Sequence, residues 1–139
     1  MQLTRHTDYS LRVLIYLALN PGRLVTISEV AETFNVSRNH MVKVVHQLST
    51  LEYIKSIRGH GGGIELAQDA ADIVVGDIIR HTENRLDVIN CQEPICPIMP
   101  VCLLKGARNE ATAAFLTVLD AYTVAELISN KTNLKKLIA

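Results

Sequence analysis

The sequence lacks any apolar run long enough to cross a membrane. Its longest candidate, residues 13–19, is followed at once by Asn20, Pro21 and Gly22, whereas a spanning helix needs roughly 18 apolar residues. The N-terminus also lacks the basic-then-apolar order and the small-residue cleavage site of a signal peptide. We therefore expect a cytoplasmic protein with no membrane partner.

Other absences narrow the class of function. The chain has no polar low-complexity tract, and 48% of its 139 residues are hydrophobic, so we expect one compact unit with an adequate core. It has no phosphate-binding P-loop, no Ser/His/Asp arrangement and no pair of carboxylates beside a histidine. Nothing therefore supports a hydrolase or a transferase, and we expect that the protein is not an enzyme.

The charge is balanced overall but not along the chain. The formal net charge is +0, yet residues 1–62 carry seven Lys or Arg against four Asp or Glu, and four of the five histidines. Residues 63–139 carry seven basic residues against ten acidic ones. A basic first half allows one face to meet a polyanion while the molecule as a whole stays neutral.

The basic half has the pattern of a helix-turn-helix. Apolar spacing predicts a helix over residues 4–20. Ser28 is a candidate cap for a short helix through Phe34, and Ser37 is a candidate cap for a longer helix over residues 38–51. In a helix-turn-helix the second helix of the pair enters the major groove of DNA.

A wing is expected directly after these helices. Residues 53–57 and 64–66 alternate in the manner of strands, and a glycine-rich turn separates them. The glycines allow the backbone to approach another surface closely, and Arg58 and His60 flank the tip of the turn. The alternative is a mobile hairpin turn without a binding role.

The polar face of the longer helix predicts contact with double-stranded DNA. Arginine suits guanine, asparagine suits adenine, and lysine reaches phosphate. The predicted DNA-binding residues of the helix and the wing are Ser37, Arg38, Asn39, His40, Lys43, Arg58, His60, Gly61 and Gly62. The alternatives are a solvated helix face and a Ser37 that acts only as a cap.

The acidic half is expected to contain a loop between two helical regions. Pro94, Pro97 and Pro100 cannot share a helix interior, so residues 90–100 are expected to form a loop. The other expected elements are a short helix over 75–83, a long helix over about 101–119, a helical continuation over 122–128 and a weak last turn over 131–139.

These expectations define the fold class and the domains. The fold should be mainly α-helical with a small β-hairpin wing, a winged helix-turn-helix joined to a long C-terminal dimerisation helix. The expected domains are a winged helix-turn-helix over residues 1–83, a cysteine-bearing loop over residues 84–102, and a dimerisation helix with a tail over residues 103–139.

The long helix carries apolar side chains that need a partner. Small alanines stand beside Leu104, Phe115 and Val118, so the helix either packs in the core or pairs with a second copy of the chain. A homodimer would place two recognition helices about 34 Å apart, which is one turn of DNA.

The three cysteines of the chain lie within twelve residues. Cys91, Cys96 and Cys102 have the spacing C-x4-C-x5-C. A reducing compartment and an odd number of thiols argue against a structural disulfide. Thiolates suit an iron–sulfur cluster or zinc, and the absence of the C-x2-C pairs of structural zinc sites favours iron–sulfur. The alternative is a coincidental group of inert cysteines.

Three thiolates leave one coordination position for another ligand. No histidine follows Cys102 closely, and Lys105 stands there instead. The candidate oxygen and nitrogen donors are Asp8, His6, His81 and Glu93. From the residues alone, Asp8 is better explained as an N-terminal helix cap or as an acid in the first turn of a helix.

Taken together, these motifs resemble the bacterial winged-helix iron–sulfur transcriptional regulators of the NsrR/IscR type over essentially the whole chain. Among these the chain is most similar to the nitric-oxide-responsive repressors. The cysteine spacing and residues 37–43 are specific matches. Further matches are Met1 to Thr4, Thr7-Asp8-Tyr9, Ile27 to Val30, Arg58-Gly59 and Gly62 to Ile64.

The resemblance implies a homodimer that binds palindromic operator DNA, represses transcription and responds to nitric oxide. It implies that Cys91, Cys96 and Cys102, with Asp8 of the partner subunit, hold a 4Fe-4S cluster. A 2Fe-2S cluster is the alternative, but the histidine of that kind of site is absent at Lys105.

Two related functions stay open, an IscR-like iron–sulfur regulator and a cluster-free regulator that senses redox change through a disulfide between two of the cysteines. An electron-transfer or cluster-assembly protein would use the same thiolates but would not need the helix-turn-helix and the wing.

Overall fold

The computed structural model describes residues 2–138 and has the predicted class, mainly helical with one antiparallel hairpin. Met1 and Ala139, the ends of the first and last expected domains, lie outside the described residues. The elements are α1 (Arg5–Leu19), α2 (Ile27–Thr33), α3 (Arg38–Thr50), β1 (Ile54–Ile57), β2 (Gly63–Leu66), α4 (Val75–Thr82), the 3-10 turn η1 (Met99–Val101), α5 (Leu103–Asp120), α6 (Val124–Leu127) and α7 (Lys131–Ile138).

Side-chain caps set the start of the two helices of the helix-turn-helix. The Ser37 hydroxyl accepts a hydrogen bond from the backbone N–H of His40 at 3.3 Å, which confirms Ser37 as the cap of α3. The prediction that Ser28 caps α2 is wrong. The Thr26 hydroxyl accepts the bond from the backbone N–H of Glu29 at 3.1 Å, so α2 begins at Ile27.

The hydrophobic core lies where α1, α3, α4 and the hairpin meet. Each element contributes side chains that are almost fully buried, including Leu14, Met41, Leu48, Ile64 and Ile78. Burial of each such side chain stabilises the fold by about 1.5–3 kcal/mol. Because the apolar stripe of α3 faces this core, its polar face is turned to solvent.

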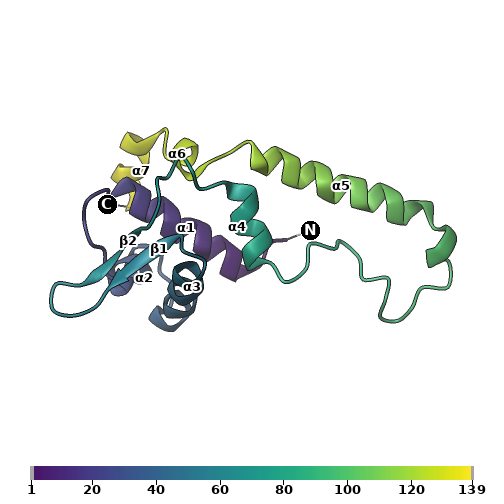
Figure 1. Cartoon of the computed structure of the whole chain (residues 1–139), viewed down its shortest axis with the longest axis horizontal. Helices are drawn as coiled ribbons and strands as arrows, with labels where there is room; N and C mark the ends of the chain where they lie inside the picture. The colour runs from purple at the N-terminus through teal and green to yellow at the C-terminus, as the bar shows by residue number, and fades with distance from the viewer. Residues whose placement is uncertain (1, 139) are drawn as a thin grey trace.

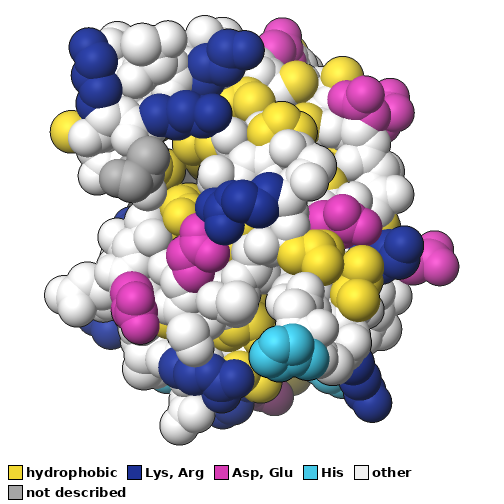
Figure 2. Space-filling model, turned by 90° about the vertical axis from the view of Figure 1, so that its left-hand side faces the viewer, with side chains coloured by type: hydrophobic (Ala, Val, Ile, Leu, Met, Phe, Trp, Pro, Cys, Tyr) yellow, Lys and Arg dark blue, Asp and Glu magenta, His cyan; other side chains and the backbone are white. Residues whose placement is uncertain are grey.

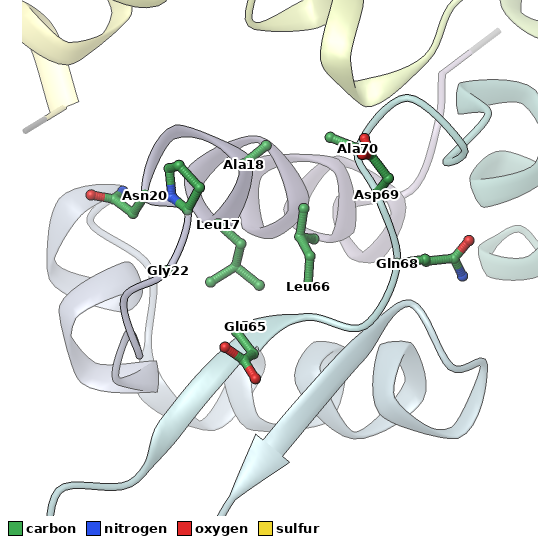
Figure 3. A pocket seen from close by; sticks show the side chains of 10 residues that line it. Leu17, Ala18, Asn20, Gly22, Glu65, Leu66, Gln68, Asp69 and Ala70 are labelled. Carbon is green, nitrogen blue, oxygen red and sulfur yellow. The ribbon is translucent and has the colours of Figure 1, made fainter.

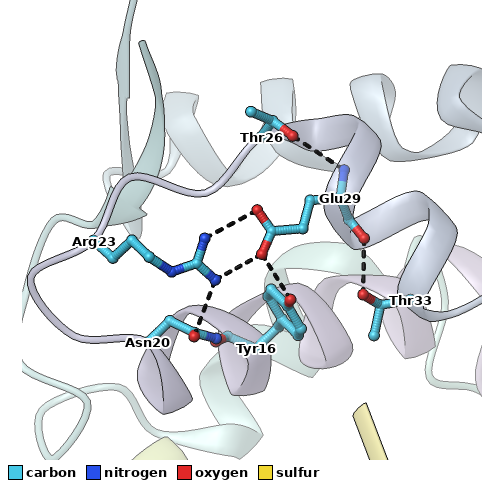
Figure 4. A network of polar contacts seen from close by, with 6 residues as sticks. All are labelled: Tyr16, Asn20, Arg23, Thr26, Glu29 and Thr33. Carbon is cyan, nitrogen blue, oxygen red and sulfur yellow. Dashed lines mark hydrogen bonds and ion pairs between the residues drawn. The ribbon is translucent and has the colours of Figure 1, made fainter. Parts of the chain in front are cut away.

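An ion pair and a tyrosine hydrogen bond hold α2 against α1 and the turn that follows it (Figure 4). The two terminal nitrogens of Arg23 donate to the Glu29 carboxylate at 3.0 and 2.6 Å, and the Tyr16 hydroxyl donates to it at 2.8 Å. The hydrogen bonds from Arg23 lower the pKa of Glu29, more than burial raises it. This network fixes the first helix of the helix-turn-helix on the core.

The chain returns to the core after α5, with α6 beside α1 (Figure 1). Val124 is fully buried, and Ile128 and Ile138 pack against the core. The expected weak last turn is in fact the helix α7, and the helical continuation is limited to α6. The division into three domains stays a prediction, and the structure adds that the tail packs on the first of them.

Helix α5 projects away from this body (Figure 1). None of its residues is buried in the single chain, and Leu103, Leu104 and Val118 are 90%, 63% and 60% exposed. The alternative that α5 packs in the core of its own chain is therefore wrong, and pairing with a second copy stays the prediction. No helix in residues 2–138 has the length and apolar character that a membrane crossing needs.

An ion pair anchors the C-terminal end of α5 to α4. The two terminal nitrogens of Arg80 donate to the Asp120 carboxylate at 2.6 and 2.7 Å. Gly76 leaves room for this carboxylate, because a Cβ there would lie 1.9 Å from one Asp120 oxygen. The outer helix is thus joined to the body at one end.

Candidate DNA-binding surface and cysteine loop

The first two turns of α3 present the predicted polar face. The helix buries Met41, Val44, Val45 and Leu48 on its inner side. The exposed residues on the opposite side include Ser37, Arg38, Asn39, His40 and Lys43. Residues in the N-terminal part of a recognition helix are the ones that contact base edges.

A hydrogen bond to the neighbouring helix α2 orients the guanidinium group of Arg38. Its Nε donates to the hydroxyl of Ser28 on α2 at 3.2 Å. The two terminal nitrogens at the end of the side chain form the fork that can bind guanine. Ser28 thus has a part in orienting Arg38 in place of the expected cap.

A shallow cleft of about 300 Å³ extends this surface from α3 toward the start of α1. Arg5 and Tyr9 of α1 line it together with His40 and Lys43 of α3. The Tyr9 and His40 rings lie with their centroids 6.4 Å apart. No sequence pattern indicates that Arg5 and Tyr9 belong to this surface, because their proximity to α3 depends on tertiary packing.

The wing places its tip residues in solvent. Arg58, His60 and Gly61 are exposed, and Gly62 is half-buried. Gly61 has a φ of +76°, which favours glycine. A Cβ at Gly62 would lie 2.2 Å from the backbone oxygen of Ile57. Any residue other than glycine would therefore clash in this turn conformation.

The wing is connected to the C-terminal end of α3. The hydroxyls of Ser49 on α3 and Ser56 on β1 are hydrogen-bonded at 3.3 Å. The two strands pair from Ile54 with Leu66 to Ile57 with Gly63. This arrangement keeps the hairpin beside α3.

Seen from the end of the molecule that carries the wing, the surface is of mixed charge (Figure 2). Lys and Arg side chains gather along the lower edge with histidine close by, and a second group lies at the upper edge. A chain of net charge +0 therefore still presents local basic surface, which a polyanion requires.

A hollow of about 290 Å³ opens between the end of α1 and β2 (Figure 3). It is lined by Leu17, Leu66 and the acidic Glu65 and Asp69, among others. None of its lining residues belongs to the predicted sites.

The cysteine loop runs outward from α4 to the far end of α5 (Figure 1). Cys91, Cys96 and Cys102 are free and half-buried. The backbone N–H of Cys96 donates to the backbone oxygen of Cys91 at 3.1 Å, which folds this part of the loop into a turn. Within residues 2–138, no three His, Cys, Asp or Glu side chains are gathered as a preformed metal site.

The candidates for a fourth ligand lie in different surroundings. Asp8 forms an ion pair with Arg12 at 2.8 Å, and 47% of its side chain is exposed. His6 is hydrogen-bonded to Gln47, and His81 to the Tyr53 hydroxyl. The remaining candidate, the exposed Glu93, belongs to the loop itself. Asp8 is thus accessible to a partner chain, whereas the two histidines take part in internal contacts.

Comparisons with known proteins agree with this architecture. A model of the Rrf2 family, described as an iron-dependent transcriptional regulator, matches residues 3–130. The HTH-type transcriptional regulator NsrR of Bacillus subtilis (strain 168) is 47% identical over 142 residues, which cover 99% of this chain and 97% of that protein.

Solved structures share the fold. CymR, the global cysteine regulator of B. subtilis, is 27% identical with a TM-score of 0.73, over 94% of this chain and 98% of CymR. IscR of T. potens is 25% identical with a TM-score of 0.77, over 94% of this chain and 88% of IscR. These matches confirm the predicted resemblance, the winged helix-turn-helix fold and a role in regulating transcription on DNA, not in catalysis. The chain belongs to the Rrf2 family of iron-dependent transcriptional regulators.

Proposed function

We propose that this regulator is a nitric-oxide-sensitive iron–sulfur repressor that binds palindromic operator DNA as a homodimer. The observation that carries the proposal is the position of the only three cysteines. They lie half-buried on one loop between the winged helix-turn-helix and α5. The 47% identity to NsrR supports the same conclusion.

The donor set fits an iron–sulfur cluster in its chemistry. Cys91, Cys96 and Cys102 offer three thiolates, the ligands that such clusters use. Beside Cys91, the Nε of Arg108 is buried without a hydrogen-bond partner in the described chain, a donor that suits an anionic group. Because the thiols are not gathered in the single chain, ligation requires the loop to draw them together.

The fourth ligand in this proposal is Asp8 of the partner subunit, in a 4Fe-4S cluster. Within residues 2–138 the Asp8 carboxylate pairs with Arg12 alone, and both side chains are partly open to solvent, so it can exchange that ion pair for a metal ligand at low cost. A carboxylate is also a harder ligand than a thiolate. Ligation would tie the loop of one chain to α1 of the other.

A connected set of contacts can carry the state of the loop to the DNA-binding surface. The Thr4 backbone N–H at the start of α1 donates to the Glu83 carboxylate at 2.7 Å. The hydroxyls of Thr7 on α1 and Thr82 on α4 are hydrogen-bonded at 2.9 Å. Helix α4 in turn holds α5 through the Arg80 ion pair. A change at α1 or α5 therefore reaches the body that carries α3.

The cluster, when bound, supplies the iron that nitric oxide attacks. Release of Asp8 of the partner subunit would remove the restraint between the loop and α1. The two recognition helices would then lose their fixed separation, and a bias of a few kcal/mol between two arrangements is enough for regulation.

Iron and sulfide analysis of anaerobically purified protein, with its visible absorption spectrum, tests the ligand set. We expect a coloured cluster in the wild type, its loss in Cys96→Ser, and a labile cluster in Asp8→Ala. Asp87→Ala is the matched control, because Asp87 is an exposed acid at the cysteine loop and should leave the cluster intact.

Iron-free, colourless wild-type protein would contradict the proposal and favour the cluster-free thiol sensor. Full and stable clusters in Asp8→Ala would remove Asp8 from the ligand set and leave the other three ligands in place.

A further inference from the structure

One charged side chain next to the cysteine loop is half-buried together with the thiols. In residues 87–111, all side chains are exposed except for five that are half-buried. These five are Cys91, Cys96, Met99, Cys102 and Arg108. Arg108 lies on the second turn of α5 and is the one cation of the group.

Arg108 contacts both the sulfur and the backbone of the cysteine loop. Its Nη1 lies 3.6 Å from the Sγ of Cys91, within hydrogen-bonding distance for sulfur. The same nitrogen donates to the backbone oxygen of Ile89, two residues before this cysteine. The guanidinium thus joins the N-terminal side of the loop to α5.

One N–H donor of the Arg108 guanidinium has no hydrogen-bond acceptor within residues 2–138. This donor is Nε, and it is buried. A buried donor of this kind costs about 1–3 kcal/mol unless an acceptor satisfies it. Such a donor next to a cysteine sulfur suits an anionic acceptor that binds at the same place.

The surroundings of Cys91 are positively charged. A cleft of about 220 Å³ beside it is lined by Arg85, Lys105 and Arg108, with Asp87 as the acidic side chain. An iron–sulfur cluster with three thiolates and a carboxylate is anionic, and N–H donors to its sulfur atoms raise its reduction potential and stabilise ligation. Arg108 is half-buried beside Cys91, whereas Lys105 is exposed, so solvent screens the charge of Lys105.

We propose that Arg108 is a positioning residue for the cluster: it orients Cys91 for ligation and donates hydrogen bonds to the sulfur side of the bound cluster. The assignment rests on the proposed function, because it presupposes that Cys91 is an iron ligand. Arg108 is not itself a ligand.

Three variants distinguish hydrogen bonding by Arg108 from the general effect of a nearby positive charge. They are Arg108→Leu, Arg108→Lys and Lys105→Leu. Lys105 is the matched control, because it is a cation one turn earlier on α5 that lines the same cleft. The measurements on anaerobically reconstituted protein are the rate of iron loss to a chelator and the midpoint potential of the cluster. We expect roughly tenfold faster iron loss in Arg108→Leu and a more negative potential.

Lys105→Leu should lose iron within twofold of the wild-type rate, and Arg108→Lys should lie between the wild type and Arg108→Leu, because it keeps the charge but not the fork. Equal rates and potentials for Arg108→Leu and Lys105→Leu would overturn the assignment of Arg108 alone. A wild-type chain that takes up no iron and sulfide would overturn the proposed function and this assignment with it.

Discussion

At the scale of single residues, the exposed face of α3 divides into side chains that can read bases and side chains that can only hold phosphate. Arg38 is oriented by Ser28 and carries a fork suited to guanine. Lys43 lies further along α3, in the cleft toward α1. Their effects on DNA binding should therefore differ in kind.

Lys43→Ala should weaken binding to all DNA sequences, because it removes a phosphate contact. The slope of the logarithm of the binding constant against the logarithm of the salt concentration should become smaller by about one. Arg38→Ala should relax the preference at one base position by about 1–3 kcal/mol. Titration of labelled operator and scrambled DNA at several salt concentrations measures both effects.

Lys136→Ala on α7 is the matched control, since it removes a cation from a helix outside the helix-turn-helix. An equal loss of sequence preference in Lys43→Ala and Arg38→Ala would contradict these roles.

The lowered pKa of Glu29 implies that the stability of the folded protein depends on pH. Its pKa is lowered below 4.5 by hydrogen bonds from Arg23, so its contribution is present above about pH 4.5 and is lost as the pH falls through the lowered native pKa. Glu29→Gln should reduce the free energy of unfolding by about 1 kcal/mol at pH 7.

Urea unfolding of the wild type and Glu29→Gln from pH 7 to pH 3.5 measures this difference, which should shrink as the pH falls. Glu32→Gln, at an exposed position on the same helix, should show little difference throughout. A constant difference at every pH for Glu29→Gln would show that its charge is not the cause.

At the scale of elements, the wing depends on the shape of its turn. Gly62→Ala should distort the hairpin, because the added Cβ would meet the backbone oxygen of Ile57 at 2.2 Å. Gly61→Ala meets no atom within 4 Å and carries only the cost of a positive φ, about 1 kcal/mol.

Operator affinity measured for both variants should therefore fall more for Gly62→Ala than for Gly61→Ala, while the far-ultraviolet circular dichroism of both stays helical. A larger loss of affinity in Gly61→Ala would mean that the tip, and not the closure of the turn, determines binding.

Most elements could be predicted from local patterns. The period of apolar residues located α1, α3 and α5, and alternation with glycines located the wing, because these signals are contained within each segment. The local pattern allows either Ser28 or Thr26 to cap α2, because both carry a hydroxyl, and the structure uses Thr26. The return of Val124 to the core depends on contacts distant in sequence and had no local signal.

The site was predictable in part for the same reason. Cysteine spacing and the polar face of α3 are local patterns. The contact of Arg108 with Cys91 joins residues 17 positions apart, and the position of Arg5 beside Lys43 joins two helices. Neither leaves a pattern in the sequence.

At the scale of the whole molecule, the exposed apolar side of α5 supports the proposed homodimer. A helix with Leu104 63% and Val118 60% exposed is stable in water when a second copy covers it. We expect Val118→Glu to convert a dimer into a monomer in sedimentation equilibrium.

Leu137→Glu is the control, because Leu137 is an equally apolar side chain, 82% exposed on α7, outside the proposed interface. Unchanged dimers in Val118→Glu would place the interface elsewhere, and dissociation in Leu137→Glu would move it to α7.

In this proposal, iron held by the cysteine loop controls DNA binding. The decisive measurement is an anaerobic titration of one operator fragment from the protein's own promoter with cluster-loaded, metal-stripped and nitric-oxide-treated protein. The cluster-loaded dimer should bind about 5- to 150-fold more tightly than the other two, a range typical of coupled sites. Equal affinity of all three forms would contradict the claim.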